Sequence, residues 1–182
     1  VSFLHCKESN YIDQYIVMIE NPIKEIYGKD TVESWNTELL IGAKFPLFSL
    51  ESSSGFKLNN DSLKGKNTFL VLWFTGCLPC VAEIPGLNRF YEDCKETNIT
   101  IYGVTYNTKS EVMNAGLFDK IHYPVFYDYK NFIDSTLQWN FGGYPTIFFI
   151  NEKQIIKKIL RGGRIDSSAS DSVYMQMKLC LK

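Results

Sequence analysis

The sequence predicts an α/β domain with a central mixed β-sheet and helices on both faces. Apolar stretches of strand length alternate with stretches of helical periodicity, which is the pattern of this class. The 182 residues are 45% hydrophobic and 15% aromatic, which is enough apolar material for one core. With 19 basic and 20 acidic residues the net charge is -1, so neither nucleic acid nor an anionic membrane surface is an expected partner.

The N-terminal part of the chain predicts a helical extension packed on a main domain. Residues 1–42 carry mixed helical periodicity that breaks at Asn21-Pro22 and at Gly28. We therefore expect two short helices there and the main domain at residues 43–182. Residues 45–50 and 55–58, separated by a polar turn, predict a β-hairpin at the start of the domain.

A buried strand and a long helix follow the hairpin. Residues 67–74 are almost continuously apolar, as in a strand covered on both faces. Residues 78–96 predict a helix, because apolar residues at three- and four-residue spacings form one stripe: Val81, Ile84, Leu87, Phe90, Tyr91 and Cys94.

The remaining elements continue the alternation. In order, the sequence predicts a strand, a shorter helix, an extended piece, a short helix, two strands and a final helix, over residues 98–107, 109–119, 123–128, 131–139, 144–150, 154–160 and 166–182. No apolar run approaches the roughly 18 residues that a membrane-spanning helix needs, so we expect a soluble domain.

The chemistry is expected where the first long strand meets its helix, at Cys77-Leu78-Pro79-Cys80. The first amides of a helix lack partners and the helix dipole is positive there, so a thiolate at Cys77 is favoured over a thiol. Cys80, one turn further on, is placed to attack a mixed disulfide formed at Cys77. Pro79 suits the first helical turn, because its missing N–H would have no acceptor there.

Two other interpretations of the cysteine pair stay open. A zinc site needs about four ligands, but there is no second CxxC and the two histidines, His5 and His122, are isolated. A purely structural disulfide is the other alternative, although closing so short a loop restricts the unfolded chain little.

Residues 42–87 resemble the thioredoxin-like family, in particular the TlpA/ResA-type extracytoplasmic thiol-disulfide oxidoreductases. The resemblance rests on the hairpin, on "LKGK" before the first long strand, and on C-x-P-C followed by x-x-E-x-P. It extends over about residues 42–165 and implies a thioredoxin fold with an N-terminal hairpin and a central insertion at about 117–141. It also implies that Cys77 is the exposed attacking cysteine and Cys80 the resolving one.

The resemblance implies further site residues. Tyr144-Pro145 occupies the place of a cis-proline that faces the cysteines and presents the Tyr144 backbone to an extended substrate; a trans proline that starts an edge strand is the alternative. Glu83 matches an active-site glutamate that could exchange a proton with Cys80, unless it is simply a solvated carboxylate. The expected substrate-contacting residues surround the pair: Trp73, Gly76, Leu78, Pro79, Tyr144 and Pro145.

The sequence also departs from the family pattern. Gly76 stands where the family usually has Trp, although Trp73 is retained, so we expect a more open surface and a looser turn at Cys77. Val71 stands where thioredoxin has a buried acid, which leaves Glu83 as the candidate for proton transfer.

The other three cysteines have simpler expectations. Cys94 lies on an apolar stripe and is expected to be a small buried hydrophobe. Cys180 is either the same or exposed, and a disulfide between Cys94 and Cys180 is open. Cys6 is considered as a lipid-bearing residue, but small residues do not precede it.

These observations predict a thiol-disulfide oxidoreductase that exchanges or reduces protein disulfides and needs no cofactor. A binding module with an idle disulfide and a thiol peroxidase are the alternatives; the peroxidase is disfavoured because Thr75 is only two residues before Cys77. The chain begins with Val1, which favours loss of an export signal, possible membrane tethering and an extracytoplasmic location. The expected partners are disulfide-containing proteins and a membrane electron-donor thiol protein, and the expected state is a monomer.

Overall fold

A computed structural model describes residues 40–52, 55–130 and 143–182. Its elements, in chain order, are β1 (Ser49–Glu51), β2 (Lys57–Asn59), α3 (Asn60–Leu63), β3 (Asn67–Trp73), α4 (Leu78–Cys94), β4 (Ile99–Thr105), α5 (Lys109–Asn114), the 3-10 helix η2 (Phe118–Lys120), β5 (Val125–Phe126), β6 (Thr146–Ile150), β7 (Ile156–Arg161) and α6 (Ala169–Cys180).

The five-stranded central sheet has the order β5-β4-β3-β6-β7 and is mixed, as the sequence predicts. β3 pairs in parallel with β4 from Asn67↔Ile99 to Trp73↔Thr105, and β4 pairs in parallel with β5. β6 runs antiparallel to both β3 and β7. The apolar strand β3 therefore lies in the middle of the sheet, with neighbours on both sides.

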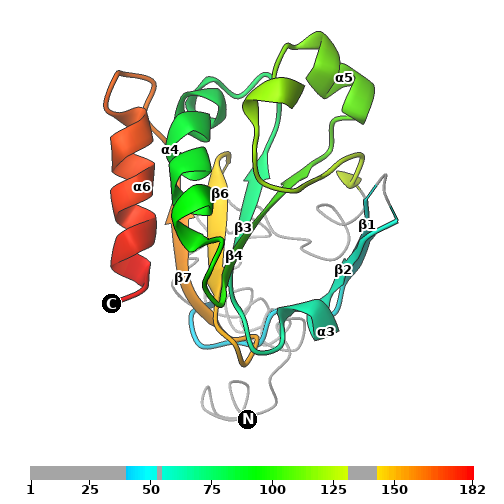
Figure 1. The fold of residues 1–182 in the computed structure, drawn as a ribbon, viewed down its shortest axis with the longest axis vertical. Helices are drawn as coiled ribbons and strands as arrows, with labels where there is room; N and C mark the ends of the chain where they lie inside the picture. The colour runs from blue at the N-terminus through cyan, green and yellow to red at the C-terminus, as the bar shows by residue number, and fades with distance from the viewer. Residues whose placement is uncertain (1–39, 53–54, 131–142) are drawn as a thin grey trace, which may run out of the picture.

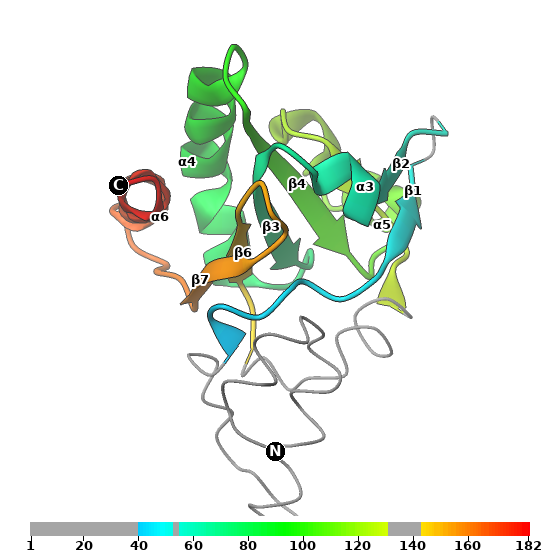
Figure 2. The same cartoon turned by 90° about the horizontal axis from the view of Figure 1, so that it is seen from below.

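The two faces of the sheet are covered by different elements (Figures 1 and 2). Helices α4 and α6 pack side by side on one face, over a cluster that includes Phe69, Phe90 and Met177. The β1–β2 hairpin and the one-turn helix α3 cover the other face, where Leu50, Leu58 and Leu63 join a second buried cluster. The predicted hairpin and the helices on both faces are confirmed.

Helices α4 and α6 approach closely at Gly86. A Cβ atom placed there would lie 2.1 Å from the Ser170 carbonyl oxygen and 2.8 Å from the Val173 side chain. Arg89 adds an exposed ion pair to Asp171 at 2.9 Å, and its guanidinium lies 3.9 Å from the centre of the Tyr174 ring. The absence of a side chain at Gly86 therefore allows the two helices to meet.

One predicted helix is shorter than expected. Periodicity suggested a helix over 109–119, but α5 ends at Asn114 and a separate 3-10 turn follows at Phe118–Lys120. Gly116 interrupts the helix with a φ of 65°, a left-handed conformation that ends a helix readily when the residue is glycine. The bounds of β3, α4, β4 and α6 lie within a few residues of the predicted ones.

Two sets of predicted helices lie outside the described residues. The first is the short helix predicted at 131–139. Most of the second half of the insertion expected at about 117–141 lies outside the described residues with it. The two N-terminal helices are the other: of residues 1–42, only 40–42 are described. Leu40 is buried and belongs to the same cluster as Phe45 and Phe48, so the described end of the extension is part of the core.

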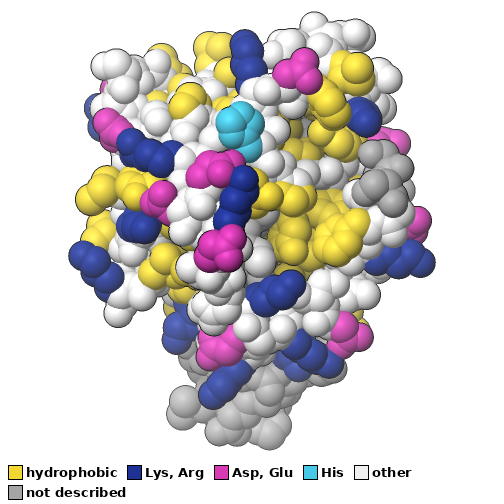
Figure 3. All heavy atoms as spheres, viewed as in Figure 1, with side chains coloured by type: hydrophobic (Ala, Val, Ile, Leu, Met, Phe, Trp, Pro, Cys, Tyr) yellow, Lys and Arg dark blue, Asp and Glu magenta, His cyan; other side chains and the backbone are white. Residues whose placement is uncertain are grey.

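Within the described ranges, no helix combines the length and the hydropathy needed to cross a bilayer. The face in Figure 3 carries interspersed basic and acidic side chains with an area of hydrophobic side chains between them. Such mixing agrees with the nearly balanced charges of the whole sequence.

Candidate active site

The cysteine pair lies where β3 runs into α4, as predicted. After Trp73 the chain turns, and the Cys77 N–H donates to the Phe74 carbonyl at 3.1 Å. Cys77 is the N-cap of α4, with extended backbone (φ -85°, ψ 97°), and its carbonyl accepts the first helical hydrogen bond, from Val81, at 3.0 Å. The first cysteine is thus fixed at the positive end of a 17-residue helix.

The two sulfur atoms form a disulfide. The S–S distance is 1.98 Å and the Cα atoms are 5.2 Å apart. The backbone N–H of Cys80 donates to Cys77 Sγ at 3.2 Å. This contact replaces the capping oxygen of an ordinary N-cap residue by sulfur, and after reduction the same N–H favours an anionic sulfur.

The disulfide is less accessible than expected. Cys77 is 5% exposed and Cys80 3% exposed, so in this oxidised form the attacking cysteine predicted to be exposed lies almost as deep as its partner. The bond explains the difference, because it holds Cys77 Sγ against the first turn of α4. Leu78, between the cysteines, is 72% exposed and is the prominent side chain of the motif.

Gly76 is exposed, but its backbone does not use the conformations that only glycine adopts readily. Its φ is outside the left-handed region, and a Cβ there would lie 3.1 Å from the Phe74 ring. That ring stacks on Tyr106, with centres 5.4 Å apart, and meets Tyr144 edge-on at 5.2 Å. Aromatic side chains from the ends of three strands therefore lie beside the turn that lacks the family's usual Trp.

The Tyr144–Pro145 bond is cis, in agreement with the family resemblance. Leu72 pairs with Thr146, so the antiparallel register places Tyr144-Pro145 beside the end of β3 from which Cys77 follows. Pro145 is buried, and its carbonyl accepts a hydrogen bond from Gly162 at 2.9 Å. Tyr144 is partly exposed, so of these two expected substrate contacts it is the more accessible.

Glu83 is a buried carboxyl and not a solvated helix-face residue. It is 5% exposed, and burial raises its pKa to about 8. Its Oε2 has no hydrogen-bond partner among the described residues. A Cβ at Gly163 would lie 2.6 Å from its Oε1 and 3.0 Å from the Pro79 Cβ, so the carboxyl lies under the backbone that follows β7. Such a pKa suits a group that exchanges protons near neutral pH.

Trp73 occupies a different place from the one predicted. It is 2% exposed and belongs to the α4 side of the core, so it cannot form part of the surface that touches a substrate in this form. The strand alternation that buries Phe69 and Val71 on that side buries Trp73 as well. Its Nε1 has no hydrogen-bond partner among the described residues.

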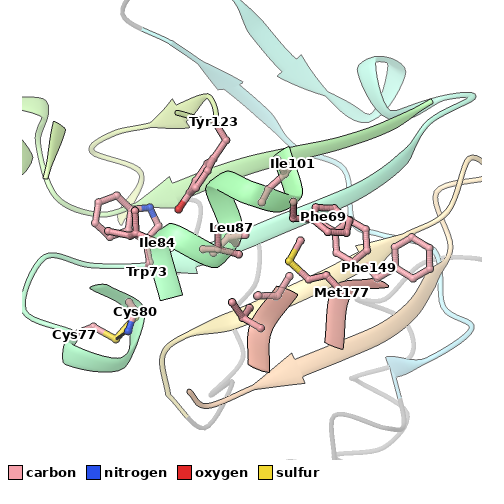
Figure 4. Packing of buried hydrophobic residues seen from close by; sticks show 14 of the residues in the cluster. Phe69, Trp73, Cys77, Cys80, Ile84, Leu87, Ile101, Tyr123, Phe149 and Met177 are labelled. Carbon is pink, nitrogen blue, oxygen red and sulfur yellow. Dashed lines mark hydrogen bonds between the residues drawn. A yellow bond between two sulfur atoms is a disulfide. The ribbon is translucent and has the colours of Figure 1, made fainter. Parts of the chain in front are cut away.

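Tyr123 lies near this site, although no motif in the sequence points to it. It is 3% exposed, and both burial and the nearby Glu83 carboxyl raise its pKa. Its position before a two-residue strand carries no motif, and only the fold brings it beside Trp73, as Figure 4 shows.

The remaining described cysteines are free thiols. Cys94 is buried in the α4 cluster, which confirms its interpretation as a small hydrophobe. Cys180 is partly exposed and donates to the Gln176 carbonyl at 3.3 Å. The disulfide considered between them is not formed, and Cys6 lies outside the described residues.

Comparisons with known proteins agree with this site. Residues 41–159 match the AhpC/TSA family. The chain is 30% identical over 138 residues to the thiol-disulfide oxidoreductase ResA of Bacillus subtilis, which covers 75% of the chain and 74% of that protein. It is 33% identical over 121 residues to the thiol:disulfide interchange protein DsbE of Pseudomonas fluorescens, covering 65% of each.

Solved structures show the same fold. The thioredoxin domain of a thiol-disulfide oxidoreductase from Bacteroides vulgatus matches with a TM-score of 0.63 at 24% identity, over 78% of this chain and 98% of that one. A thiol:disulfide interchange protein from Chlorobium tepidum matches with a TM-score of 0.60 at 25% identity, over 76% and 96%. The chain therefore belongs to the AhpC/TSA family of thioredoxin-like proteins and is a thiol-disulfide oxidoreductase of the ResA type.

Proposed function

We propose that Cys77 is the attacking cysteine and Cys80 the resolving cysteine of this oxidoreductase. The observation that carries the proposal is the position of Cys77 as N-cap of α4, with its Sγ accepting the Cys80 N–H at 3.2 Å. After reduction, this N–H and the helix dipole lower the pKa of a thiol at that position. Cys80 has no such place at the helix end, since it lies inside the first turn.

The proposed cycle transfers two electrons to a substrate disulfide. The Cys77 thiolate attacks one substrate sulfur, the substrate S–S bond breaks, and the leaving thiolate takes a proton. Cys80 then loses its proton and attacks Cys77 Sγ, which forms the Cys77–Cys80 disulfide and releases the second substrate thiolate. A dithiol protein must afterwards reduce the Cys77–Cys80 disulfide and is itself oxidised to a disulfide.

Glu83 is proposed to take the proton of Cys80 in the second step. The two residues are three apart on α4, so their side chains lie on the same face of the helix, and both are buried. With a pKa of about 8, roughly a tenth of the Glu83 carboxyl is ionised at pH 7 and available as a base. Val71, at the position of thioredoxin's buried acid, offers no proton-transfer group.

The substrates are disulfide-containing proteins, and their contact surface is proposed to be Leu78 with Gly76, Pro79 and Tyr144. The buried cis-Pro145 is proposed to present the Tyr144 backbone to the substrate. The exposure of Leu78 and the aromatic side chains beside Gly76 support an apolar docking surface. Since Leu78 brings no charge or side-chain hydrogen-bond donor to Cys77, we propose a reductant and not a strong oxidant.

The cellular setting is also a proposal. We infer an extracytoplasmic location, in line with the ResA and DsbE relatives. We also propose that the protein is a monomer and that a membrane thiol protein keeps it reduced. We propose that residues 1–42 are an extension of the domain at 43–182 and that the protein is tethered to the membrane. Measuring the reduction potential of the Cys77–Cys80 pair tests the direction of electron flow: a value near that of thioredoxin, about -270 mV, supports a reductase.

Trapping tests the roles of the two cysteines. A Cys80→Ser variant should accumulate a mixed disulfide with a disulfide-containing protein such as insulin, and peptide mapping should place the bond at Cys77. The matched Cys77→Ser variant should accumulate little, because Cys80 lacks the helix-end position. If instead Cys80 forms the adducts in the second variant while Cys77 forms none in the first, the assigned roles are reversed.

A further inference from the structure

The turn that carries Cys77 is held from the neighbouring strand. β3 and β4 run parallel and end side by side, so the residues that follow each strand meet at the same edge of the sheet. The turn after β3 is closed by the hydrogen bond from the Cys77 N–H to the Phe74 carbonyl at 3.1 Å. Thr75 and Gly76 are its central residues, and their own N–H groups need partners outside the turn.

Asn107, two residues after the end of β4, is the partner of Thr75. Its Oδ1 accepts the Thr75 N–H at 2.9 Å. Asn107 is 8% exposed, so little water competes for this contact. The hydrogen bond therefore ties the first central residue of the turn to the segment that follows β4.

Three further contacts fix the direction of the Asn107 amide. Oδ1 also accepts from the Thr105 hydroxyl at 3.2 Å, and the Thr105 oxygen accepts the Asn107 N–H at 3.2 Å. Nδ2 donates to Glu111 Oε2 at 3.5 Å. Hydrogen bonds from Thr108 and Asn107 lower the pKa of Glu111, so this carboxyl is ionised at neutral pH and can only accept. The opposite direction of the amide would place Nδ2 against the Thr75 N–H and Oδ1 against the carboxylate.

Tyr106 contacts the same turn from the same segment. Its ring stacks on the Phe74 ring with centres 5.4 Å apart, and the Phe74 carbonyl accepts the hydrogen bond that closes the turn. Gly76 has no side chain that could anchor the turn. The two residues that follow β4, Tyr106 and Asn107, thus hold the turn by a ring contact and by a hydrogen bond.

This support matters most after reduction. In the oxidised form the disulfide ties Cys77 to Cys80 in the first turn of α4. Reduction breaks that bond, and the position of Cys77 Sγ at the helix end then depends on the turn that precedes the helix. The dipole and the unpaired N–H groups of a helix act near its first turn, so a thiolate displaced from this place loses stabilisation.

We propose that Asn107 is a positioning residue that holds the turn at Thr75 and so keeps the reduced Cys77 thiolate at the start of α4. The inference rests on the proposed role of Cys77 as the attacking cysteine. Asn107 acts on the sulfur only through the backbone of the turn, and Glu111 orients its amide. Loss of the Asn107 side chain should therefore weaken the first step of the cycle, the attack by Cys77.

The test is Asn107→Ala in the full chain with Cys80→Ser, where Cys77 keeps its thiol and the motif cannot form its disulfide. The rate of alkylation by iodoacetamide is measured against pH and assigned to Cys77 by peptide mapping, which gives the midpoint of its titration. Thr108→Ala in the same background is the matched control. It removes the capping side chain of α5, next to Asn107, and leaves the Thr75 contact in place.

Asn107→Ala should raise the Cys77 midpoint by about one pH unit, and alkylation at a pH below both midpoints should slow about tenfold, because the thiolate fraction falls by that factor. Thr108→Ala should lower the thermal midpoint of the protein and leave the Cys77 titration unchanged. An unchanged Cys77 midpoint in the folded Asn107→Ala variant overturns the inference. An equal rise in Thr108→Ala also overturns it, because that would indicate a general loosening of the region.

A double variant keeps the inference testable if Asn107→Ala does not fold. Asn107→Asp combined with Glu111→Gln keeps the total charge and an oxygen for the Thr75 N–H. It also keeps a hydrogen bond between the two side chains, with donor and acceptor exchanged. With Cys80→Ser, its Cys77 alkylation rate should stay within about threefold of that of the protein with both natural residues. A fall of about tenfold would count against the hydrogen bond to Thr75 as the cause.

The Cys80→Ser protein with Asn107 intact separates this inference from the proposed function. If its Cys77 midpoint is not below about 8.5, the value of a free cysteine, the proposed activation of Cys77 is itself wrong. If the midpoint is lowered but Asn107→Ala does not change it, Cys77 is activated and Asn107 does not position it.

Discussion

Replacing Glu83 by glutamine should stabilise the folded protein at neutral pH. The pKa of this carboxyl is raised from 4.5 to about 8 by burial, so the folded state holds its proton more tightly than the unfolded state does. Between these two values the unfolded chain is ionised while the folded one is not. The free energy of unfolding therefore falls as the pH rises from about 4.5 to about 8. Glutamine has nearly the same shape and does not titrate.

The size of the effect follows from the two pKa values. Each pKa unit corresponds to about 1.4 kcal/mol, so the penalty that wild type carries and Glu83→Gln lacks is about 1 kcal/mol at pH 5 and about 3 kcal/mol at pH 7. At 5% exposure, solvent screens the carboxyl little. The difference between the two proteins should thus grow by about 2 kcal/mol over this interval.

Urea unfolding of the oxidised proteins at pH 5 and pH 7 measures this difference, because all other titrating groups are common to both. Glu96→Gln is the matched control: this side chain is exposed just after α4, and its substitution should change stability by less than about 0.5 kcal/mol at either pH. A stability difference between Glu83→Gln and wild type that is the same at both pH values would refute the raised pKa and, with it, the proposed base.

Two glycine substitutions probe the packing around the site. In an isolated helix, Gly86→Ala would be stabilising by about 1 kcal/mol. In the folded protein it should destabilise by about 2 kcal/mol or more, since the new Cβ would lie 2.1 Å from the Ser170 carbonyl oxygen. A thermal midpoint equal to that of wild type contradicts this close contact. Gly163→Ala should displace the Glu83 carboxyl, because the new Cβ would lie 2.6 Å from Glu83 Oε1. In rapid-mixing experiments the release of the second substrate thiol should slow about tenfold, while the release of the first is unchanged. Equal slowing of both releases would instead indicate a general distortion of the site.

Local patterns were sufficient for the regular elements and for the cysteine pair. The apolar run at 67–74 predicts β3 closely, because a strand that is buried on both faces is almost continuously apolar. The apolar stripe at 78–96 predicts α4 closely, because a helix that is buried on one side repeats apolar residues every three or four positions. The junction between them then located Cys77. Periodicity alone does not predict the end of α5 at Asn114, because the left-handed backbone of Gly116 ends the helix before its apolar pattern does.

Features that depend on distant contacts could not be predicted in this way. Phe74, Tyr106 and Tyr144 belong to three segments, and only the strand register brings their rings together. The family resemblance implies that Trp73 contacts the substrate, whereas the alternation of β3 directs its side chain into the core. Tyr123 has no local signal at all.

The position of the buried acid has a physical advantage that the comparison with thioredoxin brings out. An acid in the strand, at Val71, would reach the resolving cysteine only across the contact between sheet and helix, so its distance would vary with that packing. Glu83 shares α4 with Cys80, and three residues of helix fix their separation whatever the sheet does. The helix does not supply hydrogen-bond donors for a carboxylate in its interior, however, since its amides are already paired beyond the first turn. An acid moved from the strand to the helix therefore has no backbone donor for its carboxylate, and its burial raises its pKa, to about 8 at Glu83.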